Sequence, residues 1–528
     1  MPGQEAGSDV RSADSRTIKI EGNFKAALEM LEHSGKNLFI TGKAGTGKST
    51  LLQHFISTTT KRVAVLAPTG VAALNVKGQT IHSFFHFGPD ITVDTVKKLR
   101  GGRGSMYKSL DMIVIDEISM VRADLLDCID AFMRLNGRSN STRFGGTQMV
   151  FIGDLYQLPP IVAGAEAQMF KERYKSPYFF DAHAFRGFPA EFVELEKYYR
   201  HQDLKFIELL NSVRNNTATE EQIDALNRRF DPSFVPGLYD GYITLVTTNE
   251  LADEINGANL DRLGGVVHTY NAVLEGGFGR NSLPADEELK VKEGAQVMLL
   301  NNDKQGRWVN GSIGRIISIN DGKQQDTIMV RLSDGSEVGV TRHTWELFRF
   351  AYDAKTSSLS HEVVGSFIQY PLMLAWAVTI HKSQGKTFDR MVLDIGRGTF
   401  ANGQLYVALS RCRTLGGIVL KRRLEKRHIW TDWRVVRFLT RYQYDRSDSL
   451  MPLEKKMEII RTAIRNKGKL DILYLKANDE KSRRIVVPSR VGKFEYNGSS
   501  YLGMEGFDSK RNDYRNFRID RILEMKDA

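Results

Sequence analysis

Hydrophobic and polar residues alternate in different ways along this chain, and the changes mark out its predicted elements. In the front part, short and continuous apolar runs at Leu38–Thr41 and Met112–Ile115 predict buried parallel strands. A glycine-rich turn follows the first run, and apolar residues at helical spacing then predict a helix that begins near Lys48. A third run predicts a strand that ends at Gly153-Asp154. This order of strand, loop and helix favours an α/β fold.

The back part of the chain has a different texture. Residues 293–368 contain short strand-like runs separated by turns, which predict a small β-barrel. Residues 429–466 predict a helical connector. Residues 467–528 alternate apolar and polar positions between Asn-Asp, Asn-Gly and Asp-Ser turns, which predicts a compact twisted sheet. The turn formers expected in the barrel are Asn301, Asn302, Asn310 and Gly311.

Length and composition exclude several classes of protein. A chain of 528 residues is too long for one hydrophobic core and predicts about three to five domains. No run approaches the roughly 18 apolar residues that cross a bilayer, and the first residues lack the apolar segment of a secretory signal. We therefore expect an untargeted cytoplasmic protein without a membrane partner. Cys128 and Cys412 are too few for a zinc cluster or a disulfide framework.

The positive charge is concentrated at the end of the chain. Residues 421–528 hold 27 Lys and Arg against 16 Asp and Glu, whereas the first 420 residues balance at 47 against 47. The net charge of +11 therefore comes from the tail. Such a surplus favours a nucleic-acid partner, because Lys and Arg replace the counterions condensed on phosphates. A solvated basic face would have the same composition, so charge alone leaves both interpretations open.

The stretch from Gly42 to Thr50 has the pattern of a phosphate-binding loop, G-x-x-x-x-G-K-S, between a strand and a helix. Its glycines let the backbone wrap N–H groups around phosphates, and the start of the helix adds a favourable dipole. Lys48 is expected to reach the β and γ phosphates, and Ser49 to bind Mg²⁺. The predicted nucleotide-binding residues are Gly42, Lys43, Ala44, Gly45, Thr46, Gly47, Lys48, Ser49 and Thr50.

Two acidic residues follow the second apolar run, where the carboxyl end of a parallel strand should lie beside the phosphate-binding loop. Asp116 is predicted to hold Mg²⁺, directly or through water, and Glu117 to orient and deprotonate the attacking water. Gln157, after the third run, is a candidate for coupling, because its neutral side chain can sense a γ-phosphate without opposing the charge. A simple turn residue is the alternative at that position.

Taken in order, these pieces resemble a superfamily 1 helicase, and within it the Pif-one group of 5′-to-3′ DNA helicases, which is related to the RecD type. The resemblance covers approximately residues 20–425. The motifs that carry it are "APTGVAALNVKGQTIHSFF" (67–85), "VIDEISMV", "GDLYQLPP", "WAVTIHKSQGKTFD" (376–389) and "LYVALSRCRT" (405–414).

The resemblance implies two RecA-like domains that clasp ATP, with a Src-homology-like barrel inserted in the second to cover the strand. A polar insertion at 86–104 is the expected position of a wedge that splits the duplex. The implied boundaries are 1–20 for a flexible N-terminus, 21–195 for the first RecA-like domain, 196–292 with 369–428 for the second, and 293–368 for the barrel.

In this family, arginines supply positive charge to the transition state. Arg411 in "ALSR" and Arg200 in "EKYYRHQD" match the positions of these family arginines. An exposed surface arginine is the alternative for each. His201, after Arg200, stands where the family usually has glutamine. Many relatives read adenine with a glutamine before the phosphate-binding loop, where this chain offers only Asn23, which could equally cap a helix. The resemblance implies ATP with Mg²⁺, and hydrolysis of GTP or other triphosphates stays open.

Single-stranded nucleic acid should lie across the tops of both RecA-like domains, where polar groups grip phosphates and aromatic rings stack on bases. The contacts that the resemblance nominates are Pro68, Thr69, Gly70, His82, Phe84, Thr379, His381, Lys382, Ser383 and Gln384. For His82 and His381 a buried imidazole is the alternative. The donors of "HKSQG" favour phosphate contact over core packing.

Residues 467–528 resemble a WYL domain, named for Trp-Tyr-Leu, although Ser500 stands in place of the tryptophan. In that family a groove with arginines and aromatic residues is thought to bind nucleic acid or a charged nucleotide ligand. Because alternate residues of a strand share a face, Arg515 and Arg518 should lie on opposite faces, so one groove cannot hold every arginine. Salt-bridged surface arginines are the alternative. The matching positions are Arg484, Tyr501, Arg515 and Arg518.

We therefore expect an ATP-dependent DNA helicase that acts on single-stranded, forked or structured DNA in repair and recombination. Its WYL domain would add DNA binding or regulation, and the monomer would be the basic form, with an oligomer possible on DNA. We expect a bacterial-type protein, at the nucleoid when working. Two alternatives stay open: a regulatory ATPase whose WYL domain senses a ligand, and a motor directed to RNA.

Overall fold

The computed structural model describes residues 9–11, 17–19, 22–88, 90–100, 104–162, 167–199, 203–277, 283–303, 305–320, 326–353, 358–396, 398–399, 401–496 and 498–528. The chain forms two compact units. The first comprises Met1–Val213 and Ala218–Trp430, and the second comprises Arg214–Thr217 and Thr431–Ala528. Over the ranges described, no helix is long and apolar enough to span a membrane.

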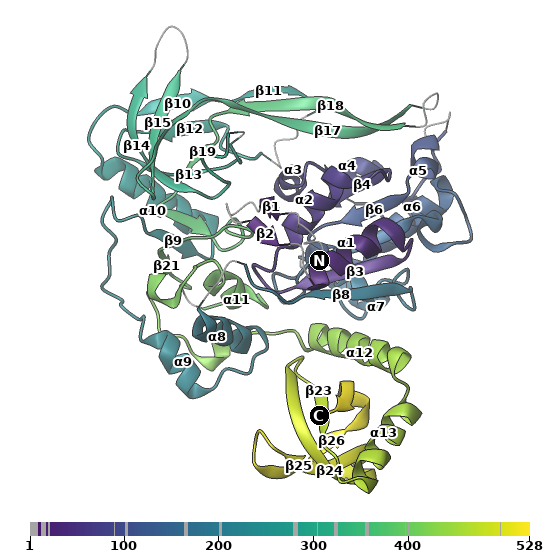
Figure 1. Ribbon diagram of the computed structural model, residues 1–528. Helices are drawn as coiled ribbons and strands as arrows, with labels where there is room; N and C mark the ends of the chain where they lie inside the picture. Colours follow the sequence, from purple (N-terminus) through teal and green to yellow (C-terminus); the bar gives the residue numbers. More distant parts are fainter. Residues whose placement is uncertain are drawn as a thin grey trace, which may run out of the picture. The chain divides into compact units, whose positions relative to one another are not determined.

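A six-stranded sheet with the order β5-β4-β6-β7-β3-β8 lies in the N-terminal part of the first unit, which we call the front region (Figure 1). Every pairing in it is parallel. Because helices cover such sheets, the inner strands are mostly apolar, as the sequence predicts for β3 and β6. The strands are β3 (Asn37–Gly42), β4 (Val63–Ala67), β5 (Gln79–Thr80), β6 (Met112–Ile115), β7 (Gln148–Ile152) and β8 (Ala190–Leu195). The helices of this region are α1 (Gly22–His33), α2 (Lys48–Thr58), α3 (Gly70–Asn75), α4 (Ile81–Phe85), α5 (Ser105–Ser109), α6 (Ala123–Asn136) and α7 (Ala167–Arg173).

A second parallel sheet has the order β20-β9-β21-β22. Its strands are β9 (Ile243–Val246), β20 (Ala377–Thr379), β21 (Met391–Leu393) and β22 (Ile418–Leu420), so an insertion of more than a hundred residues separates the first two. The accompanying helices are α8 (Leu204–Arg214), α9 (Glu220–Asn227), α10 (Asn249–Arg262) and α11 (Gln404–Leu409). Two parallel sheets with helices confirm the predicted α/β fold.

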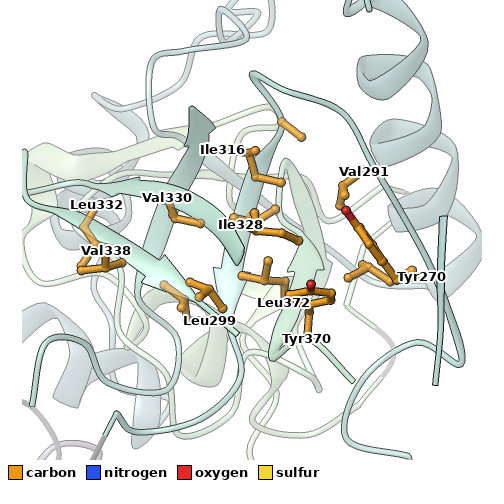
Figure 2. Packing of buried hydrophobic residues seen from close by; sticks show 14 of the residues in the cluster. Tyr270, Val291, Leu299, Ile316, Ile328, Val330, Leu332, Val338, Tyr370 and Leu372 are labelled. Carbon is orange, nitrogen blue, oxygen red and sulfur yellow. The ribbon is translucent and has the colours of Figure 1, made fainter. Parts of the chain in front are cut away.

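The insertion contains an antiparallel five-stranded sheet with the order β16-β15-β14-β13-β19. Figure 2 shows its core, to which Tyr270 and Val291 of the neighbouring pair β10 and β12 also contribute. The strands of the sheet are β13 (Gln296–Leu299), β14 (Ile313–Asn320), β15 (Thr327–Leu332), β16 (Glu337–Val340) and β19 (Leu372–Leu374). The pair comprises β10 (His268–Asn271) and β12 (Glu288–Val291).

Residues 343–368, which the sequence placed in the barrel, lie outside that sheet. They form a long hairpin of β17 (His343–Asp353) and β18 (Ser358–Gln369), extended by β11 (Val273–Gly276) (Figure 1). Strands of 11 and 12 residues alternate as barrel strands do, so the sequence pattern does not separate them. β17 packs against α4, α5 and β5 of the front region.

Within the second unit, helices α12 (Trp433–Leu450) and α13 (Leu453–Arg465) precede an antiparallel sheet with the order β26-β25-β24-β23-β27. Ile460 and Ala463 of α13 belong to the same buried cluster as Leu470 and Met504 of the sheet. The core of this unit therefore begins before residue 467, because the apolar side of α13 packs on the sheet. The strands are β23 (Leu470–Leu475), β24 (Lys481–Tyr496), β25 (Ser499–Asp508), β26 (Asp513–Arg518) and β27 (Ile522–Asp527).

Two predicted segments are only partly described. Within 1–20 the structure describes β1 (Asp9–Arg11) and β2 (Thr17–Lys19), which pair antiparallel. The flexibility of this terminus stays a prediction. Of the predicted wedge at 86–104, the described part is tied to α6, because Leu99 donates its N–H to Asn136 Oδ1 at 2.8 Å. Its role as a wedge stays a prediction.

Candidate nucleotide cleft and nucleic-acid track

The phosphate-binding loop joins β3 to α2, which begins at Lys48 as predicted. Gly45 and Gly47 adopt φ angles of 82° and 87°, which residues with a Cβ rarely reach. The Lys48 ammonium donates to the carbonyl oxygens of Gly42 at 2.6 Å and Lys43 at 3.2 Å. It therefore lies inside the loop that would surround phosphates, while Ser49 is exposed beside it.

Asp116 and Glu117 follow β6, whose carboxyl end lies at the same edge of the sheet as that of β3. Burial, followed by the charge of Glu117, raises the pKa of Asp116 to about 7. Burial also raises the pKa of Glu117, against the lowering effect of Lys48 and Arg411. A buried carboxyl next to a half-buried one favours a site that accepts a cation or a proton. The described residues contain no cluster of three or more His, Cys, Asp or Glu arranged to hold a metal.

Arg411 follows α11 and is only 1% exposed, so it is not the surface arginine of the alternative interpretation. Its guanidinium donates to Val407 O at 2.9 Å, to Ser410 Oγ at 2.7 Å and to Lys386 O at 3.5 Å. These bonds fix its position next to the carboxylates, as its effect on the pKa of Glu117 indicates. Arg200 and His201 lie outside the described residues, so the role of Arg200 stays a prediction.

One cavity of about 760 Å³ brings together residues from both parallel sheets and the inserted sheet. Of the predicted site residues it is lined by Ala44–Thr50, Glu117, Gln157 and Arg411. The sequence missed Tyr199 and Arg413, which also line it. Their signals were available, because Tyr199 precedes Arg200 in "EKYYR" and Arg413 follows Arg411 by two residues. Asn23 instead donates to Glu194 O at 3.1 Å.

Gln157 contacts the predicted nucleic-acid track directly, since its Oε1 accepts a hydrogen bond from Gln384 Nε2 at 3.1 Å. The position is buried, and Gln157 also donates to Asp154 Oδ2 at 3.3 Å. Asp154 is fully buried and accepts a bond from the hydroxyl of Tyr406. Asp154 and Tyr406 are functional candidates that sequence reasoning missed, because nothing in a lone carboxyl or a helical tyrosine predicts their contact.

Three predicted nucleic-acid contacts are buried in the structure. Phe84 is 2% exposed and packs edge-on against Tyr107 and Phe350, so it offers no face for a base to stack on. Ser383 is fully buried and donates to Ile380 O at 2.7 Å, and Thr379 is 4% exposed. The structure does not support contacts by these side chains, because apolar packing and local turn geometry use them.

The other predicted contacts are accessible. Lys382 and Thr69 are exposed, and Pro68, Gly70, His82, His381 and Gln384 are half-buried. Burial, with the charge of Arg122, lowers the pKa of His82, and burial lowers that of His381. Both imidazoles therefore favour the neutral form at pH 7. Thr69 also caps α3, since its Oγ1 accepts the N–H of Ala72 at 3.2 Å.

The loop between β13 and β14 connects the two parallel-sheet regions. The Asn310 side chain donates to Asn75 Oδ1, at the end of α3, at 3.1 Å, and accepts from Lys386 Nζ at 2.8 Å. Gly311, at φ 95°, passes so close that a Cβ there would lie 3.2 Å from the Lys386 side chain. Asn310 and Gly311 are therefore packing residues as well as turn formers.

In the second unit, the four predicted residues divide between two faces of the sheet. Arg484 is 9% exposed and pairs with buried Asp508 at 2.9 Å, and with Arg515 it lines a cavity of about 390 Å³. On the opposite face, Arg518 lies over the ring of Tyr501 at 5.3 Å. The division of Arg515 and Arg518 agrees with the expected alternation.

The face with Tyr501 carries a continuous stack of aromatic and cationic groups. Tyr501 stacks on Phe494 with ring centroids 5.9 Å apart, and Arg490 lies 4.6 Å over the other ring. A register shift between Pro488 and Arg490 brings Phe494 opposite Tyr501. Arg490 and Phe494 were not predicted, because the shift cannot be seen in the alternation of the sequence.

Comparison with known proteins decides the family. A family model described as PIF1-like helicase matches residues 21–224, and a WYL domain model matches residues 455–527. The ATP-dependent DNA helicase Pif1 of Bdellovibrio bacteriovorus is 31% identical over 411 residues, which cover 76% of this chain and 88% of that protein. The chain belongs to the Pif1-like helicase family. The WYL match begins in α13, in agreement with the core of the second unit.

Other Pif1 proteins extend the comparison. The ATP-dependent DNA helicase PIF1 of Emericella nidulans is 30% identical over 473 residues, covering 78% of this chain and 62% of that protein, so this chain spans less than two thirds of that relative. A crystal structure of Bacteroides Pif1 with ADP-AlF4 is 36% identical, covers 81% of this chain and 98% of that one, and has a TM-score of 0.73. A crystal structure of Bacteroides Pif1 bound to ssDNA has a TM-score of 0.59. It is 35% identical and covers 81% of this chain and 98% of that one.

Proposed function

We propose that this protein is an ATP-driven helicase and translocase that moves 5′-to-3′ along single-stranded DNA and unwinds forked or structured duplexes. The observation that carries the proposal is the shared cavity, in which the phosphate-binding loop and Glu117 of one parallel sheet meet Arg411 of the other. The matched relatives are named ATP-dependent DNA helicases, which supports DNA as the substrate. The direction of travel is proposed from the resemblance of the sequence motifs.

The proposed division of labour in the cleft follows from the positions of the side chains. The loop N–H groups and Lys48 hold the phosphates of ATP, and Arg411, with Arg200 as the predicted second arginine, stabilises the charge that develops as the γ-phosphate leaves. Glu117 accepts the proton of the attacking water. Ser49 and Asp116 offer hard oxygen ligands that suit Mg²⁺, which would neutralise phosphate charge when bound. Such a cation would also favour the ionised form of Asp116.

The proposed track combines accessible donors at the carboxyl ends of both parallel sheets. Thr69 and Gly70 follow β4, and Lys382 and Gln384 follow β20. These groups suit phosphates rather than base edges, which predicts binding with little sequence preference and a strong dependence on salt. Because the proposed ligand of this track is DNA and a matched relative is bacterial, we propose that the protein works at the nucleoid. We further propose a monomer that can assemble on DNA.

For the WYL region we propose a second grip on single-stranded DNA, through the face with Tyr501 and Arg518. An aromatic and arginine stack suits unpaired bases. Arg518 also pairs with Asp520 at 2.6 Å, but both side chains of that pair are exposed, whereas the pair of Arg484 and Asp508 is buried. Arg518→Ala should weaken binding of a dT oligonucleotide and lower its salt slope, whereas Arg515→Ala, on the other face, is the matched control. A loss with Arg515→Ala alone would move the proposed site to the Arg484 cavity and favour a ligand-sensing role.

Unwinding of paired 5′-tailed and 3′-tailed duplexes is the experiment that tests the main proposal. With Mg²⁺ and ATP, the full chain should separate the 5′-tailed duplex and leave the 3′-tailed one intact. The reverse result contradicts the direction, and hydrolysis stimulated by nucleic acid without any unwinding contradicts the helicase. Stimulation by RNA of the same sequence at least equal to that by DNA would favour the RNA-directed motor.

A further inference from the structure

A buried chain of hydrogen bonds connects the phosphate-binding loop with the predicted track, and Tyr406 is its central member. The Tyr406 hydroxyl accepts the N–H of Ala44 at 2.9 Å and donates to Asp154 Oδ2 at 3.2 Å. The same carboxylate oxygen accepts from Gln157 Nε2 at 3.3 Å, and Gln157 Oε1 accepts from Gln384 Nε2 at 3.1 Å. One hydroxyl thus links four segments that are distant in the sequence.

The interior of the chain makes these bonds consequential. Tyr406 is 4% exposed and Asp154 is fully buried, so water does not readily replace a partner that leaves. A phenol hydroxyl has a single proton. Here the Tyr406 hydroxyl donates that proton to Asp154, and its oxygen accepts the N–H of Ala44. If the Ala44 N–H turns toward another acceptor, the hydroxyl of Tyr406 loses a donor. The hydrogen bonds that Tyr406 and Gln157 make to Asp154 then have to rearrange together.

The helix that carries Tyr406 also holds the guanidinium of Arg411, the arginine proposed to act on the nucleotide. α11 spans Gln404–Leu409, and the Arg411 guanidinium is bonded back to Val407 O in the same helix. We expect a shift of α11 that brings Arg411 toward a nucleotide to move Tyr406 as well, because the helix carries Tyr406 and holds the guanidinium. Gly403, before the helix, lets α11 approach the turn at Tyr156, because a Cβ there would lie 2.2 Å from the Tyr156 carbonyl oxygen.

We propose that Tyr406 is a positioning residue that couples occupancy of the nucleotide cleft to the grip of the Gln384 segment on single-stranded nucleic acid. The proposal rests on the proposed helicase function and names the connection between its two sites. With nucleotide bound, the Ala44 N–H and α11 shift, the Tyr406 hydroxyl bridge is remade, and Gln157 passes the change to Gln384. The two arrangements of this bridge are the two states that both ligands bias.

The test measures coupling directly, as the ratio of dT-oligonucleotide affinities with and without the ATP analogue AMP-PNP and Mg²⁺, by fluorescence anisotropy. Tyr406→Phe removes the hydroxyl and keeps the ring. Tyr174→Phe is the matched control, because its hydroxyl also donates to a buried carboxylate, Asp127 Oδ2 at 2.9 Å, and Tyr174 does not line the nucleotide cavity. Thermal unfolding of both variants compares their stability.

We expect Tyr406→Phe to bring the ratio at least about threefold closer to one, and Tyr174→Phe to keep the ratio of the parent protein. An unchanged ratio in Tyr406→Phe overturns the proposal, as does an equal loss in both variants. Should Tyr406→Phe unfold, Asp154→Asn takes its place with the same expected loss. A parent that hydrolyses ATP and binds dT without coupling contradicts this inference alone, whereas a parent that does neither contradicts the helicase function.

Discussion

Replacement of Gly403 by alanine should disturb both the stability and the catalysis of the first unit, in amounts that the structure allows us to work out. Gly403 has φ 72°, a conformation that costs an L-residue about 1–2 kcal/mol. A Cβ would also lie 2.2 Å from Tyr156 O and 2.8 Å from Gln157 O. Relief of these contacts moves α11 by roughly 1 Å, at a further cost of about 1–3 kcal/mol.

The same displacement carries Tyr406 and Arg411 away from the cleft. A misplacement of roughly 1 Å at a reacting centre lowers turnover about 100-fold, so we expect that loss in the rate of DNA-stimulated ATP hydrolysis. Gly187→Ala is the matched control, because Gly187 has φ 64° and a Cβ there meets nothing within 4 Å. It should show the strain alone, with about 1–2 kcal/mol lost and normal turnover.

Urea unfolding and steady-state hydrolysis, measured on both variants, separate the two effects. The difference in unfolding free energy between the variants isolates the cost of the close approach. If Gly403→Ala and Gly187→Ala unfold at the same urea concentration and hydrolyse ATP equally fast, α11 does not approach the Tyr156 turn as described, and the reasoning is refuted.

Three further predictions concern separate parts of the chain. Glu117→Gln should lower ATP turnover by about 10²–10⁴-fold while leaving dT binding intact, because an amide cannot accept the proton of water; retained hydrolysis would exclude Glu117 as the base. Burial alone would raise the pKa of Asp111, but the hydrogen bonds and charge of Arg62 hold that pKa at about 2. Asp111→Asn should therefore lower the free energy of unfolding by roughly 1 kcal/mol near pH 7, and this loss should disappear as the pH falls from about 4 to 2. A loss that urea unfolding finds to be independent of pH contradicts the ion pair. Arg484→Ala should lower the unfolding free energy of the second unit by about 3–5 kcal/mol, because it strands buried Asp508. A change below about 1 kcal/mol in calorimetry would instead indicate an ordinary surface pair.

The parts of the site that depend on neighbouring residues could be predicted from the sequence. The loop from Gly42 and the start of α2 at Lys48 follow from glycine spacing and apolar periodicity, and β6 spans the predicted residues Met112–Ile115. Parallel strands then place Asp116 at the correct edge without any knowledge of tertiary contacts.

The parts that depend on distant residues could not. Tyr406 and Ala44 are separated by 362 positions, and no local pattern announces their bond. Phe84 was predicted as a nucleic-acid contact, because an aromatic residue in the stretch 67–85 is compatible both with stacking on a base and with core packing. Only the contact with the ring of Phe350 shows that it packs. In the second unit, alternation placed Arg515 and Arg518 correctly, whereas the register shift that brings Phe494 beside Tyr501 depends on pairing between strands.

The hairpin of β17 and β18 has a consequence for how the protein is made. Phe350 completes the aromatic packing around Phe84, and its N–H donates to Gln79, 271 positions earlier in the chain. During synthesis at about 5–20 residues per second, Gln79 waits roughly 15–50 s for this partner. A fragment that ends after the first parallel sheet should therefore expose this aromatic surface and aggregate, so the nascent chain needs either rapid elongation or a chaperone over that interval.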